Sequence, residues 1–350
     1  MNIVCPTCNK AYRIRDERLS APRARATCRN CGGVIVVESS GLVRAEEQKR
    51  SLPSQGPKAA YSGDTGSDQD ILATYPKLRE IPSSRVALRE ILAPNKKGSY
   101  KTRRNTLKVK ILMAVSQVLD RALRDGERVF RIGKGTAYYP AELLFGNGWL
   151  TMMYNNYAIL ATDQRILCIN INSRMKRTTH YIFQILYGDI KKIKRGLLGT
   201  LSFVRKSSKR RVFTNVSRLI SGDLRDFIRE RADSLPDKPE KVFENICPAC
   251  FAPLEKGLLS CPACKARFKE PRKASLRSLL LPGLGDMYLG HRALGALELG
   301  GSVLVWTYVV MLILSGQREG LFVALFLLIF YNGMDGMLTL FMAKKGYMLA

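Results

Sequence analysis

The stretch YAILATDQRILCIN, residues 157–170, decides the fold of the central part of the chain. It consists of two apolar runs that are separated by the polar residues Thr162, Asp163 and Gln164. Toward the end of the second run, apolar and polar residues alternate, which is the periodicity of a β-strand. A polar break between two short runs is typical of a turn between antiparallel strands. We therefore predict two strands here, with Cys168 as a small core residue of the second one.

The same kind of pattern extends on both sides of this stretch. Short apolar runs separated by turn signals fill residues 128–216. A helix is predicted on each side of these runs. Before them, apolar residues recur every three or four positions from Ile111 to Ala122, and after them residues 221–232 have the pattern of an amphipathic helix. For residues 106–235 we predict a β-sandwich or barrel of roughly seven strands that ends with a helix.

Individual residues in this block also match the strand patterns of a known family. One strand of that family reads T-x-x-R followed by a hydrophobic residue, and a later strand reads I-x-Y-x-D-I. The matching residues are Thr162, Arg165, Ile185, Tyr187, Asp189 and Ile190. On these residues the block resembles the bacterial pleckstrin-homology-like domains. The resemblance implies a fold that serves lipid binders, peptide binders and plain scaffolds, so it does not by itself assign a function.

Eight of the nine cysteines form four C-x-x-C pairs. Two residues between thiols allow one tight turn to direct both sulfurs at one ion, and two such turns complete a tetrahedral site of four thiolates. A redox motif would instead be a single C-x-x-C near a βαβ pattern, which the sequence does not contain. We predict two zinc ions, one for each of two ligand sets: Cys5, Cys8, Cys28 and Cys31, and Cys247, Cys250, Cys261 and Cys264.

Both cysteine sets also resemble known modules. Residues 1–38 resemble the short zinc ribbon found at the N-terminus of many bacterial proteins, and residues 244–270 resemble a minimal zinc ribbon. The resemblance implies a binding module of unknown partner rather than an enzyme.

The composition changes between the first ribbon and the central block. The run LPSQGPKAAYSGDTGSDQD, residues 52–70, is rich in Gly, Ser, Pro and Asp. A segment of this kind buries too little apolar surface to offset the entropy that it loses on ordering. We predict that residues 39–105 form a flexible linker.

Two long apolar stretches follow the second ribbon, at residues 296–315 and 321–343. At a rise of about 1.5 Å per residue, a helix of either length crosses a hydrocarbon core of about 30 Å. Only GQREG separates them, so we predict that residues 275–350 form a membrane domain with a tight helical hairpin. Basic residues gather on the outer flanks of the hairpin: Arg272, Lys273, Arg277, Arg292, Lys344 and Lys345. The positive-inside rule then places both termini in the cytoplasm. The resemblance to bacterial domains implies that the membrane is the inner membrane of a bacterium.

A glycine-rich approach, a Y-x-G-x-R motif and an aspartate in the second stretch match another family. The residues are Gly285, Tyr288, Leu289, Gly290, His291, Arg292, Gly295 and Asp335. On these residues the segment resembles the domain named for its two transmembrane helices. The match is partial, because that family usually has aromatic pairs and a second aspartate placed differently, and it implies no particular activity. Residues 276–289 are apolar but too short to span a membrane, so they either lie in its interface or begin a re-entrant turn.

Two acidic residues stand inside the apolar stretches, Glu298 in the first and Asp335 in the second. Carboxylates at such depth are costly and usually face a partner or water. One hypothesis is a proton or ion site that Asp335 forms with Glu298, Asp286 or His291. The other is a structural hydrogen bond that locks the two helices, with Asn332 nearby. One hairpin is too small for a transport pathway, so we favour the structural bond, and an ion pathway would require a homo-oligomer.

The chain is strongly basic, with 57 Lys and Arg against 29 Asp and Glu and a formal net charge of +28. Such an excess attracts polyanions, either nucleic acid or the anionic face of a membrane. Between residues 190 and 212, basic residues occur without an acidic one, and in a hairpin they would present one positive rim for anionic lipid or another polyanion. They are Lys191, Lys192, Lys194, Arg195, Arg205, Lys206, Lys209, Arg210 and Arg211.

The sequence contains no evident catalytic constellation. It has no nucleophile elbow, P-loop or H-E-x-x-H motif, and its two histidines stand far apart. We therefore expect a non-enzymatic adaptor or scaffold that is anchored in the membrane, binds zinc and serves an unknown protein partner. The alternative is a membrane-tethered nucleic-acid-binding or regulatory protein that acts through residues 1–40, which are rich in arginine but offer only Tyr12 for base stacking. A third class, a small ion pathway, rests on Asp335 alone.

Overall fold

The computed structural model describes residues 68–140, 153–172, 174–196, 199–207, 210–234 and 243–350, except for the side chains of residues 177–180. It also describes short backbone strands within residues 2–45. The chain divides into two compact units, Met1–Tyr61 and Ser62–Ala350. In the first unit, strands pair antiparallel in two small sheets: β1 (Asn2–Val4) with β2 (Ala11–Arg13), and β3 (Arg23–Thr27) with β4 (Val34–Glu38) and β5 (Val43–Ala45).

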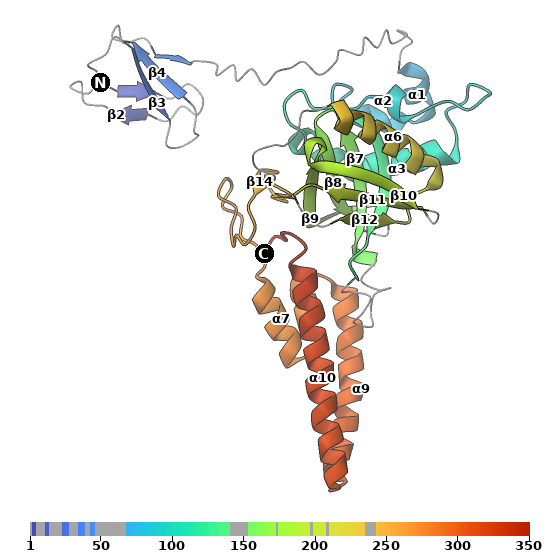
Figure 1. Cartoon of the computed structure of the whole chain (residues 1–350), viewed down its shortest axis with the longest axis vertical. Coiled ribbons are helices and arrows are strands. Elements are labelled where there is room, and N and C mark those ends of the chain that lie inside the picture. The colour runs from blue at the N-terminus through green and yellow to red at the C-terminus, as the bar shows by residue number, and fades with distance from the viewer. Residues whose placement is uncertain are drawn as a thin grey trace. The chain divides into compact units, whose positions relative to one another are not determined.

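The second unit is built on a curled antiparallel half-barrel (Figure 1). In the part of the chain that is described, its sheet has nine strands in the order β10-β11-β12-β6-β7-β8-β9-β13-β14. The strands are β6 (Val129–Ala137), β7 (Asn156–Thr162), β8 (Arg165–Ile171), β9 (Arg177–Leu186), β10 (Ile190–Gly196), β11 (Thr200–Arg205), β12 (Arg211–Thr214), β13 (Asn245–Ile246) and β14 (Pro253–Leu254). The two strands predicted from residues 157–170 are confirmed as β7 and β8, which pair antiparallel from Tyr157 opposite Asn170 to Ala161 opposite Ile166.

Helices cover the sheet on both faces. They are α1 (Gln69–Thr74), η2 (Pro76–Glu80), α2 (Leu88–Ile91), α3 (Arg103–Ala122) and α6 (Arg218–Ser234). The two predicted helices that flank the strands are confirmed as α3 and α6. Thr102 caps the start of α3, because its hydroxyl accepts a hydrogen bond from the amide of Asn105 at 3.1 Å.

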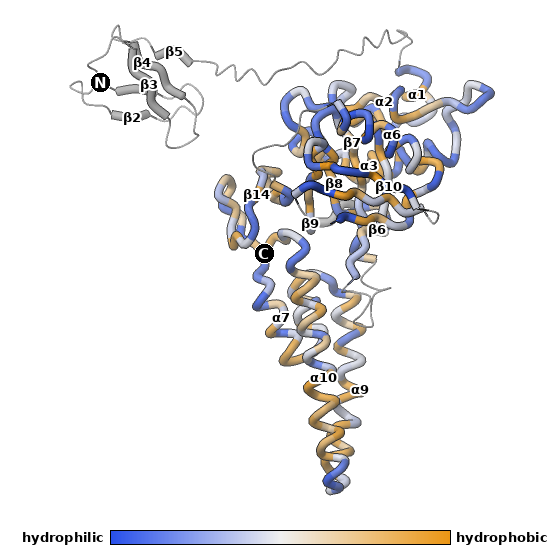
Figure 2. Tube along the Cα trace, in the orientation of Figure 1, coloured by the Kyte–Doolittle hydropathy of each residue, from blue (hydrophilic) through white to orange (hydrophobic). Residues whose placement is uncertain are grey.

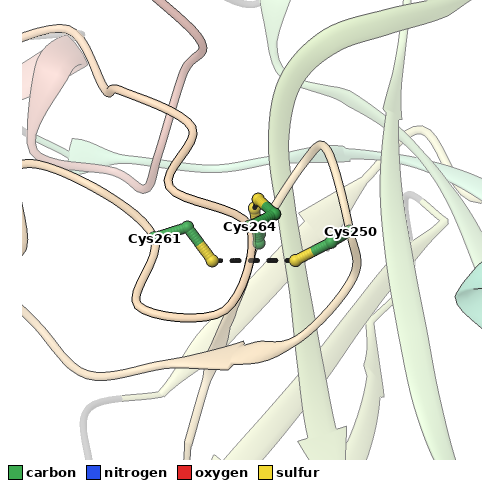
Figure 3. A group of neighbouring side chains, drawn as sticks. Cys250, Cys261 and Cys264 are labelled. Carbon is green, nitrogen blue, oxygen red and sulfur yellow. Dashed lines mark hydrogen bonds between the residues drawn. The ribbon is translucent and has the colours of Figure 1, made fainter. Parts of the chain in front are cut away.

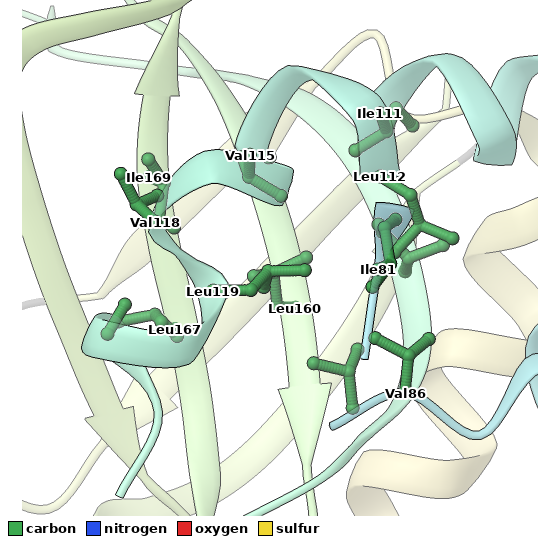
Figure 4. Close-up of a cluster of buried hydrophobic side chains, with 14 of the residues drawn as sticks. Ile81, Val86, Ile111, Leu112, Val115, Val118, Leu119, Leu160, Leu167 and Ile169 are labelled. Atoms are coloured by element: carbon green, nitrogen blue, oxygen red, sulfur yellow. The ribbon is translucent and has the colours of Figure 1, made fainter. Parts of the chain in front are cut away.

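Strands β7 and β8 are buried along their whole length. Leu160 and Leu167 face one core, where Leu119 of α3 packs with them (Figure 4). Ile159 faces the other core, which also contains Leu224 of α6. A strand with both faces buried reads as an apolar run rather than as a clean alternation, which explains the composition of residues 157–170.

The predicted flexible linker, residues 39–105, is wrong from residue 68 onward. This segment folds into α1, η2, α2 and the start of α3. Ile71, Leu78 and Ile91 are at most 1% exposed and belong to the same core as α3. The polar composition of residues 52–70 concealed this contribution, because these apolar residues are spread along short helices rather than gathered in one run. Strand β5 also falls inside the predicted linker, and residues 46–67 lie outside the described residues.

Four helices follow the second set of cysteines: α7 (Pro271–Leu280), α8 (Leu284–Leu289), α9 (Arg292–Leu314) and α10 (Arg318–Ala343). By length and composition, α9 and α10 could each cross a membrane, and they are largely hydrophobic in Figure 2. Only 17% and 22% of their most apolar windows are buried inside the structure. Their apolar side chains therefore face outward, unlike those of a core helix in a soluble domain.

Candidate functional sites

The second cysteine set is held by two turns of the same geometry. In the first turn, the amide of Phe251 bonds the carbonyl of Cys247 at 2.9 Å, and in the second the amide of Lys265 bonds the carbonyl of Cys261 at 2.9 Å. Phe251 and Lys265 both have left-handed backbone conformations, with φ of 62° and 61°. Each turn thus reverses the chain within five residues and directs its two thiols to the same side.

The four thiols converge on one point. Cys247 Sγ lies 3.8 Å from Cys264 Sγ, and Cys250 Sγ lies 3.6 Å from Cys261 Sγ (Figure 3). All four sulfurs lie within 4.8 Å of one another. Zinc–thiolate bonds of about 2.3 Å in a tetrahedron place sulfurs about 3.8 Å apart, whereas a disulfide would bring them to about 2.05 Å. The residues present therefore fit one zinc ion, which would crosslink the two turns.

The segment around this cysteine cluster, residues 243–270, is called the second ribbon below, and it also holds the residues that follow α10. The ring of Phe268 lies 4.5 Å from that of Tyr347, and the hydroxyl of Tyr347 accepts a hydrogen bond from the amide of Leu258 at 3.0 Å and donates one to the carbonyl of Glu255. On its other side, β13 pairs with β9 of the half-barrel. The candidate metal centre is thus a joint between the sheet and the end of the apolar hairpin.

The remaining cysteines divide into two groups. Cys168 lies in the core of β8 as predicted, and burial raises the pKa of its thiol. The first predicted ligand set lies outside the described residues: Cys5, Cys8, Cys28 and Cys31.

Three carboxylates gather where α8, α9 and α10 meet. Asp286, Glu298 and Asp335 are buried, and their oxygens lie within 4.8 Å of one another. Asp335 Oδ2 accepts a hydrogen bond from the amide of Gly283 at 3.0 Å. This is the kind of structural bond that we favoured for Asp335, but its partner is a backbone amide before α8 rather than Asn332.

Asp286 belongs to a buried polar network that involves α9 and α10. Asp286 accepts a hydrogen bond from the hydroxyl of Thr339 at 3.0 Å, and its second oxygen lies 3.1 Å from His291 Nδ1. The backbone packs tightly around it, because a Cβ on Gly283 would lie 2.3 Å from the carbonyl of Gly295. The glycines and the aspartate of the predicted membrane domain thus hold α8 against the two long helices.

The predicted basic rim is wrong for two of its members. Arg205 is buried and pairs with Asp189 at 2.7 Å and with Glu244 at 3.0 Å. Arg211 is 22% exposed and also pairs with Glu244. Both acids lie outside the run of residues 190–212, so the run looked uncompensated although long-range contacts neutralise two of its charges.

The rest of the rim is exposed where it is described, and helix α6, which we did not predict as part of the rim, adds two arginines to it. Lys191, Lys192, Lys194 and Arg195 lie exposed on β10, as do Lys206 and Arg210 after β11, while Lys209 lies outside the described residues. A cavity of about 390 Å³ separates β10 from α6, where Arg225 and Arg229 line it opposite Lys191. The four-residue spacing of these arginines on an amphipathic helix was the signal that could have found them.

The comparison with known families agrees with the first ribbon. The zinc-ribbon domain family matches residues 1–36, which include all four cysteines of the first set. No curated protein matches the chain. The chain thus combines an N-terminal zinc-ribbon domain with a curled antiparallel half-barrel, a cluster of four cysteines at residues 247–264 and two candidate membrane helices.

Proposed function

We propose that the chain is a membrane-anchored, zinc-binding adaptor or scaffold without enzymatic activity, located at the inner membrane of a bacterium. In this proposal it presents a pleckstrin-homology-like half-barrel and the first zinc ribbon to the cytoplasm. Seven strands, β6 to β12, followed by helix α6 support the pleckstrin-homology-like assignment. The exposed lysines of β10 support an attraction to anionic surfaces, which salt would screen and to which each charge would add at most about 1 kcal/mol.

One observation carries the proposal: the half-barrel is joined to the apolar hairpin at more than one place. The hydroxyl of Tyr181 on β9 donates to the carbonyl of Met342 at the end of α10 at 2.5 Å. The second ribbon pairs with β9 on one side, and on the other its Lys269 amide bonds the carbonyl of Met348 at 2.9 Å. Several connections of this kind would hold a binding domain at a set position above a membrane, which an adaptor requires.

The adaptor role predicts that proteins are recovered through the first ribbon. We expect affinity capture of the full chain from bacterial membranes to recover a reproducible set of cytoplasmic proteins, and removal of residues 1–40 to abolish that recovery. The matched control is Cys5→Ser with Cys8→Ser, which keeps the arginines and removes the metal ligands, and it should behave like the deletion.

Two outcomes would count against this role. The same set of proteins from the intact and the shortened chain would contradict it. Recovery that nuclease treatment abolishes would favour the alternative, a membrane-tethered nucleic-acid-binding protein.

The proposed topology predicts opposite accessibility for the loop and the end of the hairpin. Basic residues gather at the cysteine-side ends of α9 and α10, whereas Arg318 is the one basic residue among residues 316–320. We therefore expect a tag inserted within residues 316–320 to be labelled from outside the inner membrane of intact cells. A reporter fused after Ala350 should be active only in a cytoplasmic form. Labelling of the loop only after permeabilisation would contradict the hairpin or its orientation.

A further inference from the structure

A second cavity, of about 510 Å³, lies where the sheet, the second ribbon and the residues after α10 meet. Its charged lining is mainly cationic, with five basic residues against one acidic residue, and the basic residues come from three distant segments. The cationic residues are Arg211 of β12, Lys256 and Lys269 of the ribbon, and Lys344 and Lys345 after α10. This cavity contains neither the cysteine ligands nor the exposed lysines of β10.

The one acidic side chain in this lining is already neutralised. Glu244 Oε1 accepts from Arg211 Nε at 2.9 Å, and Glu244 Oε2 lies 3.0 Å from Arg205. Burial alone would raise the pKa of Glu244, but the charges of Arg211 and Arg205 outweigh that effect and lower it, so the carboxylate stays ionised and paired. The negative charge of Glu244 is therefore not available to balance the lysines of the cavity.

Within the part of the chain that the structure describes, Lys256, Lys269 and Lys344 form no ion pair. Lys269 is half-buried, and that burial lowers the pKa of its ammonium. An anion placed in the cavity would therefore restore stabilising interactions that this ammonium has lost with water. Lys345 is fixed in place, since its Nζ donates to Asn155 at 2.8 Å and lies 4.8 Å from the ring of Tyr139.

The border of the cavity is apolar on the side of the hairpin. Phe341, in the last turn of α10, is 40% exposed, and Leu259 of the ribbon is 61% exposed. A ligand that fills this space can thus set a charged group among the lysines and an apolar group against α10. A volume of about 510 Å³ is in the range of small-ligand sites.

We propose that this cavity binds a phosphate-bearing ligand, and that the ligand is an anionic phospholipid whose headgroup enters between the ribbon and Lys344. The choice of a lipid rests on the proposed membrane anchoring, whereas the phosphate site rests on the cavity and its lysines. A bound headgroup would contact the sheet, the ribbon and the end of α10 at once, and so would stabilise the joint between them.

The test uses the full, zinc-loaded chain in nanodiscs of phosphatidylcholine, with calorimetric titration of two soluble probes. Dihexanoyl phosphatidic acid carries the phosphate and short acyl chains, and glycerol 3-phosphate carries the phosphate alone. We expect saturable binding of the first probe and binding of the second that is weaker by at least about tenfold. The variant with Lys256→Ala, Lys269→Ala and Lys344→Ala should lose at least about tenfold in affinity.

The matched control removes the same charge from β10, through Lys191→Ala, Lys192→Ala and Lys194→Ala, and should bind the probe as the parent does. Zinc content and melting temperature report whether the triple variant is folded, and the single variant Lys344→Ala, at an exposed position, provides a second measurement. Equal affinity for both probes would support the phosphate site and assign it to a soluble ligand. The proposal would be overturned if the first probe showed no saturable binding, or if the cavity variant and the β10 variant lost the same affinity for it. This holds whatever the topology experiment shows.

Discussion

The variant Cys261→Ser is expected to lose the zinc ion of the second ribbon and to unfold residues 243–270. The buried cluster of this module contains Cys247, Leu254, Cys261, Phe268 and Tyr347, so two of its five members are the thiols themselves. A module with so small a core depends on the metal, because metal binding of about 10–16 kcal/mol in such peptides is also their folding free energy. Loss of one ligand should therefore release both turns and the residues after α10 that pack on them.

Zinc analysis and limited proteolysis of the full chain check this expectation. We expect the zinc content to fall by one ion per chain and new cleavage sites to appear between β13 and α7, while the half-barrel stays resistant. Cys168→Ser is the matched control, because it makes the same chemical change at a buried cysteine outside the cluster and should leave the zinc content unchanged. Equal zinc in Cys261→Ser and the parent would show that this cluster does not hold the metal.

The second large effect is expected from Glu127→Ala, which removes half of a buried ion pair. Arg165 donates to Glu127 through Nε at 2.9 Å and through Nη2 at 2.9 Å, and the two side chains are 4% and 0% exposed. Thr162 and the amide of Arg124 also donate to the same carboxylate, at 2.8 and 2.7 Å. Without it, the guanidinium would remain buried and uncompensated, which typically costs about 3–5 kcal/mol of the free energy of unfolding.

Chemical denaturation of the parent and the variant measures this loss. Asp233→Ala is the control, because Asp233 pairs with Arg229 at 3.6 Å where both side chains are more than 70% exposed, and such pairs contribute little.

The pair of Glu127 and Arg165 should also govern stability in acid. Burial alone would raise the pKa of Glu127, but the hydrogen bonds and the charge of Arg165 hold it below its ordinary value of 4.5.

A carboxyl whose pKa is lower in the folded state stabilises the fold above its unfolded pKa, and this stabilisation is lost as the pH falls below it. The parent should therefore lose stability as the pH drops below about 4.5, and Glu127→Gln should show a flatter dependence over the same range. Variants that match the parent in both measurements would contradict the role of this pair.

The strand pattern that carried the resemblance has a structural explanation. Thr162 and Arg165 bind Glu127, and the hydroxyl of Tyr187 donates to the carbonyl of Thr162 at 2.5 Å. Asp189 pairs with Arg205 at 2.7 Å. These polar residues lie inside the half-barrel and connect its strands, so the pattern reports how the fold is held together rather than where a ligand binds.

Local patterns in the sequence determined the elements that depend on neighbouring residues. Periodicity identified β7, β8 and α3, and the C-x-x-C spacing identified the four cysteines whose thiols converge, because each turn that directs two thiols spans only a few residues. The length and composition of the last two apolar stretches were enough to predict α9 and α10 as candidate spans.

Tertiary structure alone decided which charges are free and which segments share a core. Arg205 and Arg211 belong to a basic run in sequence, yet Asp189 and Glu244 neutralise them, and Glu244 lies more than thirty residues away from either arginine. The lysine-lined cavity and the carboxylate cluster each combine segments that are distant along the chain. Periodicity and spacing report interactions within one turn or strand, whereas burial and ion pairing depend on contacts that form only when the whole chain folds.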